Sequence, residues 1–338
     1  MNTILKPSDI VVSGVRTSGK LTIGNYFGAI SNFVKLQDTC DHIYCFLADL
    51  HTLTTHTNAE ELKESTRLTL AIYLGCGLDS NKANIYVQSQ LKEISELYLY
   101  FNMFAYKGEL ERTTTFKEKI EKHSDNINAG LLTYPVLMAA DVLIHKGNFV
   151  PIGKDQTQHL EMMRNFGNRF NFKYNCSIFP EPQAFNNGEA LLKVPSLGGS
   201  GKMDKSGPEE YAIFLTDSDK EIEKKIKRAV TDTGPTVPNS NKPESIQNLF
   251  DIMKLVSQSS VINHFEEKFN DCSIRYGDFK KQIADDMILF LKPIREKIDY
   301  YYNHEELLNE AADKGLEKAQ QSASNTMKEV REVMGFSK

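Results

Sequence analysis

Near its start the chain reads SGVRTSGKLTIGNYFG, which spans residues 13–28. The apolar run at residues 10–12 predicts a short buried strand, and residues 30–36 place apolar side chains on one helical face. Glycines let a ligand approach the backbone, and a helix start offers free N–H groups to a phosphate. The spacing matches neither the dinucleotide fingerprint nor the usual triphosphate loop. The segment therefore predicts a phosphate site or an ordinary strand-to-helix turn.

Length and composition narrow the class of protein. The 338 residues suggest two units, and 40% hydrophobic and 25% charged residues are typical of a soluble globular protein. A net charge of −5 confines any nucleic-acid surface to a local patch. No apolar run approaches the length of a membrane helix, and no signal peptide is evident. Five scattered cysteines without a C-x-x-C pair fit a reducing compartment, so we expect a cytoplasmic protein with no membrane partner.

Strand and helix patterns alternate along the first two thirds of the chain. Further buried strands are predicted at residues 43–49, 83–88 and 149–152, and helices at 58–75, 93–105, 129–144 and 160–170. Asn58 is the predicted N-cap of the helix at 58–75. This alternation predicts the α/β class, with a doubly wound, Rossmann-like parallel sheet. Polar residues follow two strands, at 51–56 and 153–159, where such sheets bind ligands. His51 taken alone is more commonly a structural histidine than a ligand contact.

The helix predicted at residues 129–144 is nearly all apolar but carries three exceptional side chains. Tyr134, Met138 and Asp141 are spaced by four and three residues, which places them on one face. An aspartate in apolar surroundings needs a partner. A nearby backbone N–H would be a structural partner, and a ligand donor in an apolar pocket would be a functional one.

A glycine- and lysine-rich segment, GGSGKMDKSG, occupies residues 198–207. It is either a surface linker or a mobile loop whose lysines neutralise a triphosphate. Helical patterns dominate after residue 211, with a Pro/Asn-rich break at 234–243. We therefore predict a Rossmann-like catalytic domain at residues 1–207 and an all-helical C-terminal domain at 208–338, whose last helix is placed to pack back on the first domain.

Two of these segments resemble the paired signatures of class I aminoacyl-tRNA synthetases. The sequence TIGN at residues 22–25 resembles the family's HIGH motif, and KMDKS at 202–206 resembles KMSKS. The segments GELERT (108–113), GLLTYPVLMAAD (130–141) and VPIGKDQTQH (150–159) are similar to the bacterial type of tryptophanyl-tRNA synthetase. The resemblance covers essentially the whole chain. It departs from the family pattern at Thr17, where proline is frequent, at Thr22 and Asn25, which replace histidines, and at Asp204, which replaces a serine.

The resemblance implies a tryptophan–tRNA ligase that first makes tryptophanyl-adenylate and pyrophosphate from tryptophan and ATP, and then charges tRNA(Trp). Mg²⁺ is expected on the ATP phosphates, with no metal site in the protein. The implied ATP-binding residues are Arg16, Thr17, Ser18, Gly24, Asn25, Gly153, Lys154, Asp155, Val194, Lys202, Met203, Asp204, Lys205 and Ser206. Those expected to act in catalysis are Thr22, Asn25, Lys119, Lys202, Lys205 and Ser206.

The resemblance also implies a tryptophan pocket. Asp141 is expected to accept the indole N–H, and Tyr134 and Gln156 to address the ammonium group. The residues expected to shape the pocket are Met138, His51, Val150 and Ile152. The family further implies a homodimer and an anticodon-binding role for the helical domain. Two alternatives stay open: a tyrosyl-tRNA synthetase, and a nucleotide- or RNA-binding paralogue that does not charge tRNA, to which Asp204 points.

Overall fold

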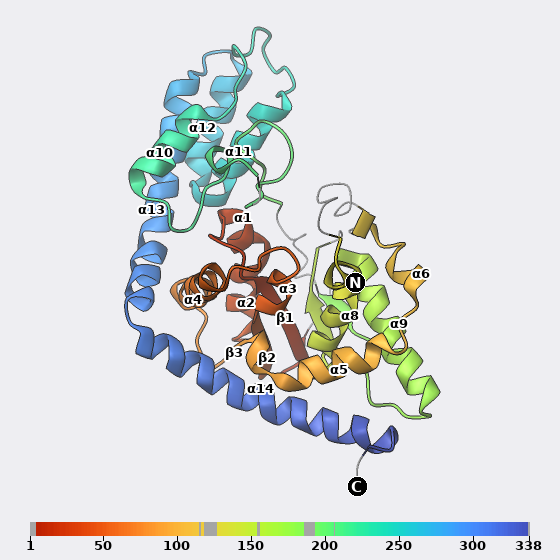
Figure 1. Ribbon diagram of the computed structural model, residues 1–338. Coiled ribbons are helices and arrows are strands. Elements are labelled where there is room, and N and C mark those ends of the chain that lie inside the picture. The colour runs from red at the N-terminus through yellow and green to blue at the C-terminus, as the bar shows by residue number, and fades with distance from the viewer. Residues whose placement is uncertain are drawn as a thin grey trace.

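A five-stranded parallel sheet forms the centre of the molecule, as the computed structural model in Figure 1 shows. The structure describes residues 5–114, 116–117, 127–153, 156–185, 193–205 and 207–336. The strand order is β3-β2-β1-β4-β5, so the chain switches direction across the sheet between β1 and β4. The strands are β1 (Ile10–Arg16), β2 (His42–Ala48), β3 (Asn84–Val87), β4 (Phe149–Pro151) and β5 (Gln183–Phe185). The predicted α/β class with a doubly wound parallel sheet is confirmed.

Two details of the sheet differ from the sequence prediction. Strand β1 continues through Arg16, because every residue from Ile10 to Arg16 pairs with β2. Its Gly14 is required by a close approach, since a Cβ there would lie 2.5 Å from the Phe46 ring. Strand β5 was not predicted at all. It is three residues long and mostly exposed, so it lacks the apolar pattern of a buried strand.

Helices cover both faces of the sheet. Side chains alternate along β2, so that Ile43, Cys45 and Leu47 enter one hydrophobic core while Tyr44, Phe46 and Ala48 enter the other. The first core contains α2 (Ser31–Leu36) and α4 (Ala59–Gly75). The second contains α5 (Lys92–Asn102), α8 (Ala129–Leu143) and α9 (Thr157–Lys173). The short helices α3 (Asp49–Thr52) and α6 (Lys107–Leu110), and the 3-10 turns η2 (Gln88–Gln90) and η4 (Glu209–Tyr211), complete this part.

Local capping explains where α4 begins. The Asn58 side chain accepts hydrogen bonds from the backbone N–H groups of Glu60 and Glu61, as predicted for the start of α4. The first helix, α1 (Ile23–Asn25), passes directly into a π-helical turn, η1 (Tyr26–Ile30), before α2. The apolar spacing correctly predicted a helical segment here but not its π-helical turn.

The rest of the chain is helical, in α10 (Asp219–Arg228), α11 (Glu244–Val256), α12 (Ser259–Asn270), α13 (Tyr276–Tyr302) and α14 (Glu305–Val333). In Figure 1, α13 descends from this helical lobe beside α4, and α14 runs back along β3. The approach of α14 is close, because a Cβ on Gly315 would lie 1.9 Å from the carbonyl oxygen of Ile85.

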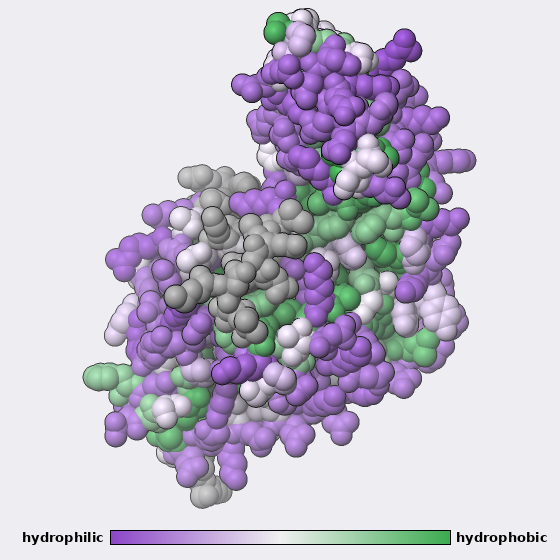
Figure 2. Space-filling model, turned by 180° about the vertical axis from the view of Figure 1, so that it is seen from behind, coloured by the Kyte–Doolittle hydropathy of each residue, from purple (hydrophilic) through white to green (hydrophobic). Residues whose placement is uncertain are grey.

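The surface of the helical lobe is largely hydrophilic on the side seen in Figure 2, and hydrophobic residues gather below it, where the lobe joins the rest of the molecule. Among the described residues, none of the helices combines the length and apolarity that crossing a membrane requires. The domain boundary at residues 207/208 stays a prediction.

Candidate active site

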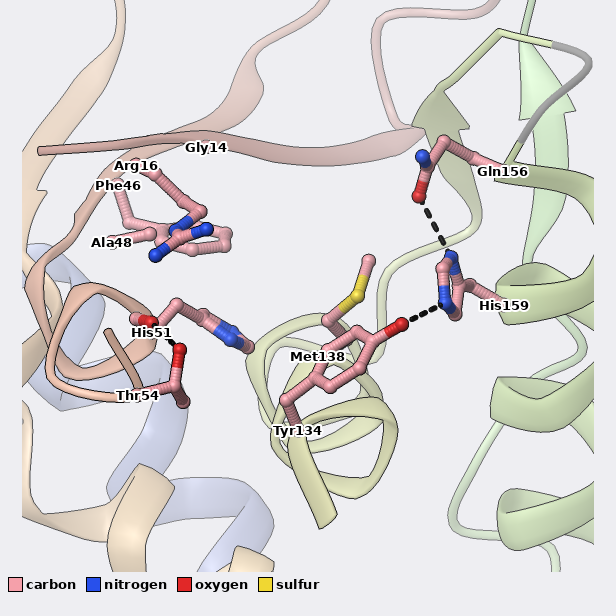
Figure 3. Close-up of a pocket in the computed structure, with 10 residues that line it drawn as sticks. All are labelled: Gly14, Arg16, Phe46, Ala48, His51, Thr54, Tyr134, Met138, Gln156 and His159. Carbon is pink, nitrogen blue, oxygen red and sulfur yellow. Dashed lines mark hydrogen bonds between the residues drawn. The ribbon is translucent and has the colours of Figure 1, made fainter. Parts of the chain in front are cut away.

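A cavity of about 280 Å³ lies at the carboxyl ends of β1 and β2, beside the point where the strand order switches (Figure 3). Open α/β sheets bind ligands at this position. Its lining comes from five separate segments of chain: Gly14 and Arg16 of β1; Phe46 and Ala48 of β2; His51 and Thr54 after β2; Tyr134 and Met138 of α8; and Gln156 and His159 at the start of α9. The cavity lies where the polar strand ends predicted a crevice, and His51, Thr54, Gln156 and His159 from those segments line it.

One wall of the cavity is a chain of hydrogen-bonded side chains. The Tyr134 hydroxyl lies 2.7 Å from His159 Nε2, and His159 Nδ1 lies 2.7 Å from the amide oxygen of Gln156. His159 is buried, and its ring meets the Tyr134 ring edge to face. Figure 3 shows the three side chains converging from α8 and α9. This wall presents oriented dipoles to a ligand.

Asp141 is fully buried and is not among the described residues that line the cavity. Its Oδ2 lies 2.8 Å from His51 Nε2, and its Oδ1 accepts a hydrogen bond from Gln88 Nε2 at 2.6 Å. Burial raises the pKa of the Asp141 carboxyl, while the His51 hydrogen bond and charge oppose that shift. The partners are therefore side chains rather than the backbone N–H considered above. His51, which lines the cavity, connects Asp141 to it.

The opposite wall carries positive charge at the end of β1. Arg16 donates from Nη2 to Thr55 Oγ1 at 2.8 Å, and burial lowers the pKa of its guanidinium. Within the described part of the chain, Arg16 Nε is buried without a hydrogen-bond partner. Lys205 Nζ donates to the Arg16 carbonyl at 2.9 Å. Burial and the Arg16 charge lower the pKa of Lys205 to about 8, against the opposing charge of Asp204. Two partly desolvated cations fit an anionic ligand such as a triphosphate.

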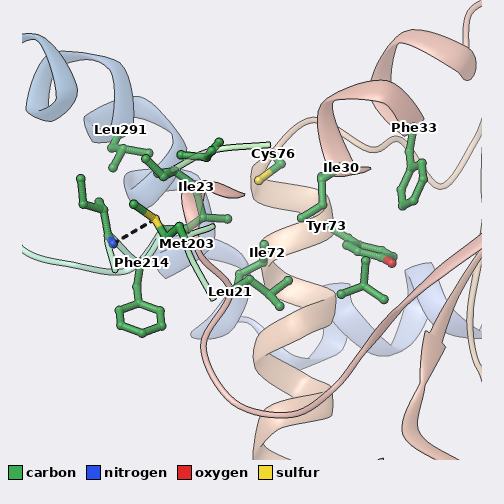
Figure 4. Packing of buried hydrophobic residues seen from close by; sticks show 14 of the residues in the cluster. Leu21, Ile23, Ile30, Phe33, Ile72, Tyr73, Cys76, Met203, Phe214 and Leu291 are labelled. Atoms are coloured by element: carbon green, nitrogen blue, oxygen red, sulfur yellow. Dashed lines mark hydrogen bonds between the residues drawn. The ribbon is translucent and has the colours of Figure 1, made fainter. Parts of the chain in front are cut away.

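The two signature-like segments meet in the core. A Cβ on Gly24 would lie 3.3 Å from the Met203 carbonyl oxygen. The Met203 N–H donates to the Val194 carbonyl at 2.8 Å, and the Met203 sulfur accepts from the Ile213 N–H at 3.4 Å. Figure 4 shows Met203 packed among buried apolar residues that include Leu21. The side chains of Met203 and Val194, both predicted at the ATP site, thus pack in the hydrophobic core.

Thr22 and Asn25, predicted to act in catalysis, bind each other in a capping box at the start of α1. Asn25 Oδ1 accepts from the Thr22 N–H at 2.9 Å, and Thr22 Oγ1 accepts from the Asn25 N–H at 3.3 Å. Thr17 is also buried, with its carbonyl accepting from Ser65 Oγ at 2.6 Å, and Ser18 is half-buried. These contacts give Thr22, Asn25 and Thr17 structural roles. Their proposed roles toward ATP stay predictions.

The remaining predicted residues fall into three groups. Val150 and Ile152 pack in the second core and are not among the described cavity-lining residues. Gly153 accepts from the Gln156 N–H at 3.0 Å, and Lys202 is exposed and forms an isolated β-bridge with Pro195. The predictions for Lys119, Lys154, Asp155 and Ser206 lie outside the described residues.

Sequence reasoning missed Gly14, Phe46 and Ala48 of the lining. Thr54 and His159 also line the cavity, and they stand in the polar strand ends that predicted the crevice. Alternation along β1 and β2 was available for the other three. To use this signal for Gly14, one would also have to know that β1 extends beyond residue 12.

Comparisons with known proteins agree with this geometry. A sequence model of the family described as tRNA synthetases class I (W and Y) matches residues 6–292, and the chain belongs to this family. A tryptophan–tRNA ligase of Porphyromonas gingivalis is 53% identical over 97% of this chain and 99% of its own length. These matches place the chain on the tryptophan side of the family.

Solved structures are also similar. A tryptophanyl-tRNA synthetase of Campylobacter jejuni, complexed with ADP and tryptophan, matches with a TM-score of 0.85 and 33% identity, over 96% of this chain and 99% of that one. A tyrosyl-tRNA synthetase of Aeropyrum pernix matches with a TM-score of 0.66 but only 18% identity, over 94% of this chain and 90% of that one. The second likeness concerns the fold alone.

Proposed function

We infer that this chain is a tryptophan–tRNA ligase. One observation of the site carries the inference: a single cavity joins a cationic wall, formed by Arg16 with Lys205 beside it, to a wall of neutral acceptors on α8 and α9. ATP supplies anionic phosphates for the cationic wall, and an amino acid supplies an ammonium group for the acceptors. The P. gingivalis ligase and the C. jejuni complex with ADP and tryptophan support the choice of substrates.

The reaction has two steps. A carboxylate oxygen of tryptophan attacks the α-phosphorus of ATP, the bond from that phosphorus to the bridging β-oxygen breaks, and pyrophosphate leaves. A terminal ribose hydroxyl of the tRNA then attacks the acyl carbon, and AMP leaves. The protein mainly positions the reactants and stabilises charge on the leaving phosphates. Arg16, Lys202 and Lys205 supply that charge, and MgATP is the form of the substrate.

Tryptophan is held by its two polar ends. Tyr134 and Gln156 accept hydrogen bonds from the ammonium group on the α8/α9 wall. Asp141, oriented by His51 and Gln88, accepts the indole N–H at the other end, because each carboxylate oxygen has a second lone pair. Met138 adds apolar lining. A site built around such an acceptor discriminates strongly against side chains that leave it unpaired.

The helical C-terminal part binds the anticodon region of tRNA(Trp) by stacking and phosphate contacts, and the reaction takes place in the cytoplasm, where tRNA serves the ribosome. We also propose a homodimer. Large apolar side chains exposed on and after α5, namely Leu99, Met103 and Tyr106, offer a surface for the second copy. Light scattering after size exclusion tests this, since a mass equal to one chain contradicts it.

The function is tested by amino-acid-dependent exchange of labelled pyrophosphate into ATP, run in parallel with tryptophan and with tyrosine. Exchange with tryptophan only is the expected result, followed by charging of tRNA(Trp). Exchange with tyrosine instead would overturn the substrate assignment and keep the reaction. Folded protein that binds ATP but exchanges with neither amino acid would identify the non-charging alternative.

A further inference from the structure

His159 stands between the two groups that hold the amino-acid ammonium in the proposed function. It belongs to the first turn of α9, three residues after Gln156, and faces Tyr134 on α8. The ring is buried, lines the cavity, and is hydrogen-bonded on both nitrogens at 2.7 Å. The proposed function gives roles to Tyr134 and Gln156 but none to His159.

These contacts fix the hydrogen positions along the wall. The amide oxygen of Gln156 can only accept, so His159 Nδ1 carries the hydrogen of that bond. When the ring is neutral, Nε2 has no hydrogen and accepts from the Tyr134 hydroxyl. That hydroxyl hydrogen then points at His159, so the lone pairs of the Tyr134 oxygen are directed away from the ring. The Gln156 oxygen is held in the same way, by the bond from Nδ1.

We propose that His159 is a positioning residue, which orients the Tyr134 and Gln156 oxygens as acceptors for the substrate ammonium group. The proposal rests on the proposed function. It assigns to one imidazole the orientation of two acceptors on different helices. The fixed geometry means that the acceptors need no rearrangement when the ammonium group arrives. An acceptor that is free to rotate would instead turn its hydrogen toward a cation for part of the time.

The two nitrogens can be tested separately. In His159→Asn the amide nitrogen replaces Nδ1 and keeps the Gln156 bond, but the Tyr134 bond is lost. In His159→Gln the amide oxygen replaces Nε2 and keeps the Tyr134 bond, but the Gln156 bond is lost. We expect each variant to raise the dissociation constant of tryptophan about tenfold, and His159→Leu to raise it further, because hydrogen bonds to a charged group weaken when their acceptor is misplaced.

The discriminating measurement compares two ligands. Indole-3-propionate retains the indole and carboxylate of tryptophan and lacks the ammonium group. The chain contains no tryptophan, so the fluorescence of either ligand reports its binding directly. We expect the His159 variants to weaken tryptophan binding and to leave indole-3-propionate binding within about twofold of wild type. An equal loss for both ligands would mean that His159 only supports the fold, and unchanged tryptophan binding would also overturn the proposal.

A double-mutant cycle assigns the Nε2 contact. Tyr134→Phe removes the hydroxyl that His159 Nε2 orients, so adding His159→Asn to it should cost nothing more in tryptophan affinity. Adding His159→Gln should still cost about tenfold, since the Gln156 bond is then also lost. Fully additive effects of Tyr134→Phe and His159→Asn would contradict the assignment.

His145→Gln is the matched control. His145 is also a buried histidine whose Nε2 lies against a tyrosine hydroxyl, Tyr86 at 2.9 Å, but it packs away from the cavity. Its variant should lower thermal stability without changing the ratio of the two ligand affinities. Wild-type protein that lacks tryptophan-dependent exchange would overturn the proposed function. If the wild type shows exchange and the His159 variants bind tryptophan as tightly as the wild type does, only the role of His159 would be overturned.

Discussion

The two walls of the cavity present opposite kinds of chemistry. At the end of β1, Arg16 and Lys205 are cations that burial has deprived of water, and their pKa values are lowered as a result. On α8 and α9, Tyr134, His159 and Gln156 form a continuous hydrogen-bonded chain. Under the proposed function, phosphate recognition depends on charge, and hence on pH. Ammonium recognition depends on the orientation of acceptors, and hence on geometry.

Removing charge from the first wall should give the largest effect. In Lys205→Ala we expect adenylate formation to slow, because its activation free energy should rise by about 2–4 kcal/mol, the scale for one oriented group that stabilises developing charge. Tryptophan-dependent pyrophosphate exchange measures it. The exposed Lys82, replaced by alanine, is the control. Near-normal exchange by folded Lys205→Ala would remove Lys205 from the charged wall.

Asp141→Ala tests whether recognition of the amino acid is separate from the charged wall. The change leaves the buried His51 and Gln88 donors without their acceptor. We therefore expect kcat/KM for tryptophan to fall by a factor equivalent to about 2–3 kcal/mol, while KM for ATP changes little. Steady-state exchange kinetics give both constants. Asp217→Ala removes another buried carboxylate, one paired with Lys225, and controls for lost stability. Equal losses for both substrates would indicate a merely structural Asp141.

The pH profile should separate the walls further. Lys205 is charged below its pKa of about 8 and loses its proton above it, so kcat/KM for ATP should decline as pH rises through 8. Between pH 7 and pH 9 the expected decline is about tenfold, from the fraction of protonated lysine. Lys205→Arg stays charged in this range and should lose the decline. Measuring both proteins in the same buffers removes the titration of the substrates, and identical profiles would contradict the assignment.

The smallest effect is expected at the capping box beside the charged wall. Thr22→Ala removes the side-chain acceptor of the Asn25 N–H and should lower the free energy of unfolding by about 1 kcal/mol. Thr22→Ser retains the acceptor and should unfold like wild type in a denaturant titration. A loss of exchange in Thr22→Ala far beyond this loss of stability would support the catalytic role predicted from sequence.

The predictions from sequence succeeded where a local pattern carries the information. Apolar runs alternating with amphipathic helices defined the doubly wound sheet, and Asn58 marked the start of α4 as expected. Strand β5 has no such pattern. It is defined by its pairing with β4, which the sequence around it does not reveal. The sequence did not predict that the Met203 side chain packs in the core, which follows because its loop folds against the residues after it. The role of Met203 toward ATP stays a prediction.

By itself, the sequence determined the α/β class, the family, and the segments that form the site, because periodicity and motifs are properties of neighbouring residues. Only the tertiary structure decided which groups are partners. Asp141 meets His51 across 90 residues of chain and Gln88 across 53, and Lys205 reaches the Arg16 carbonyl across 189. Such contacts depend on how the sheet brings distant strand ends together. The physical reason is that a buried polar group takes whatever partner lies within hydrogen-bond distance after packing, and local sequence does not encode that distance.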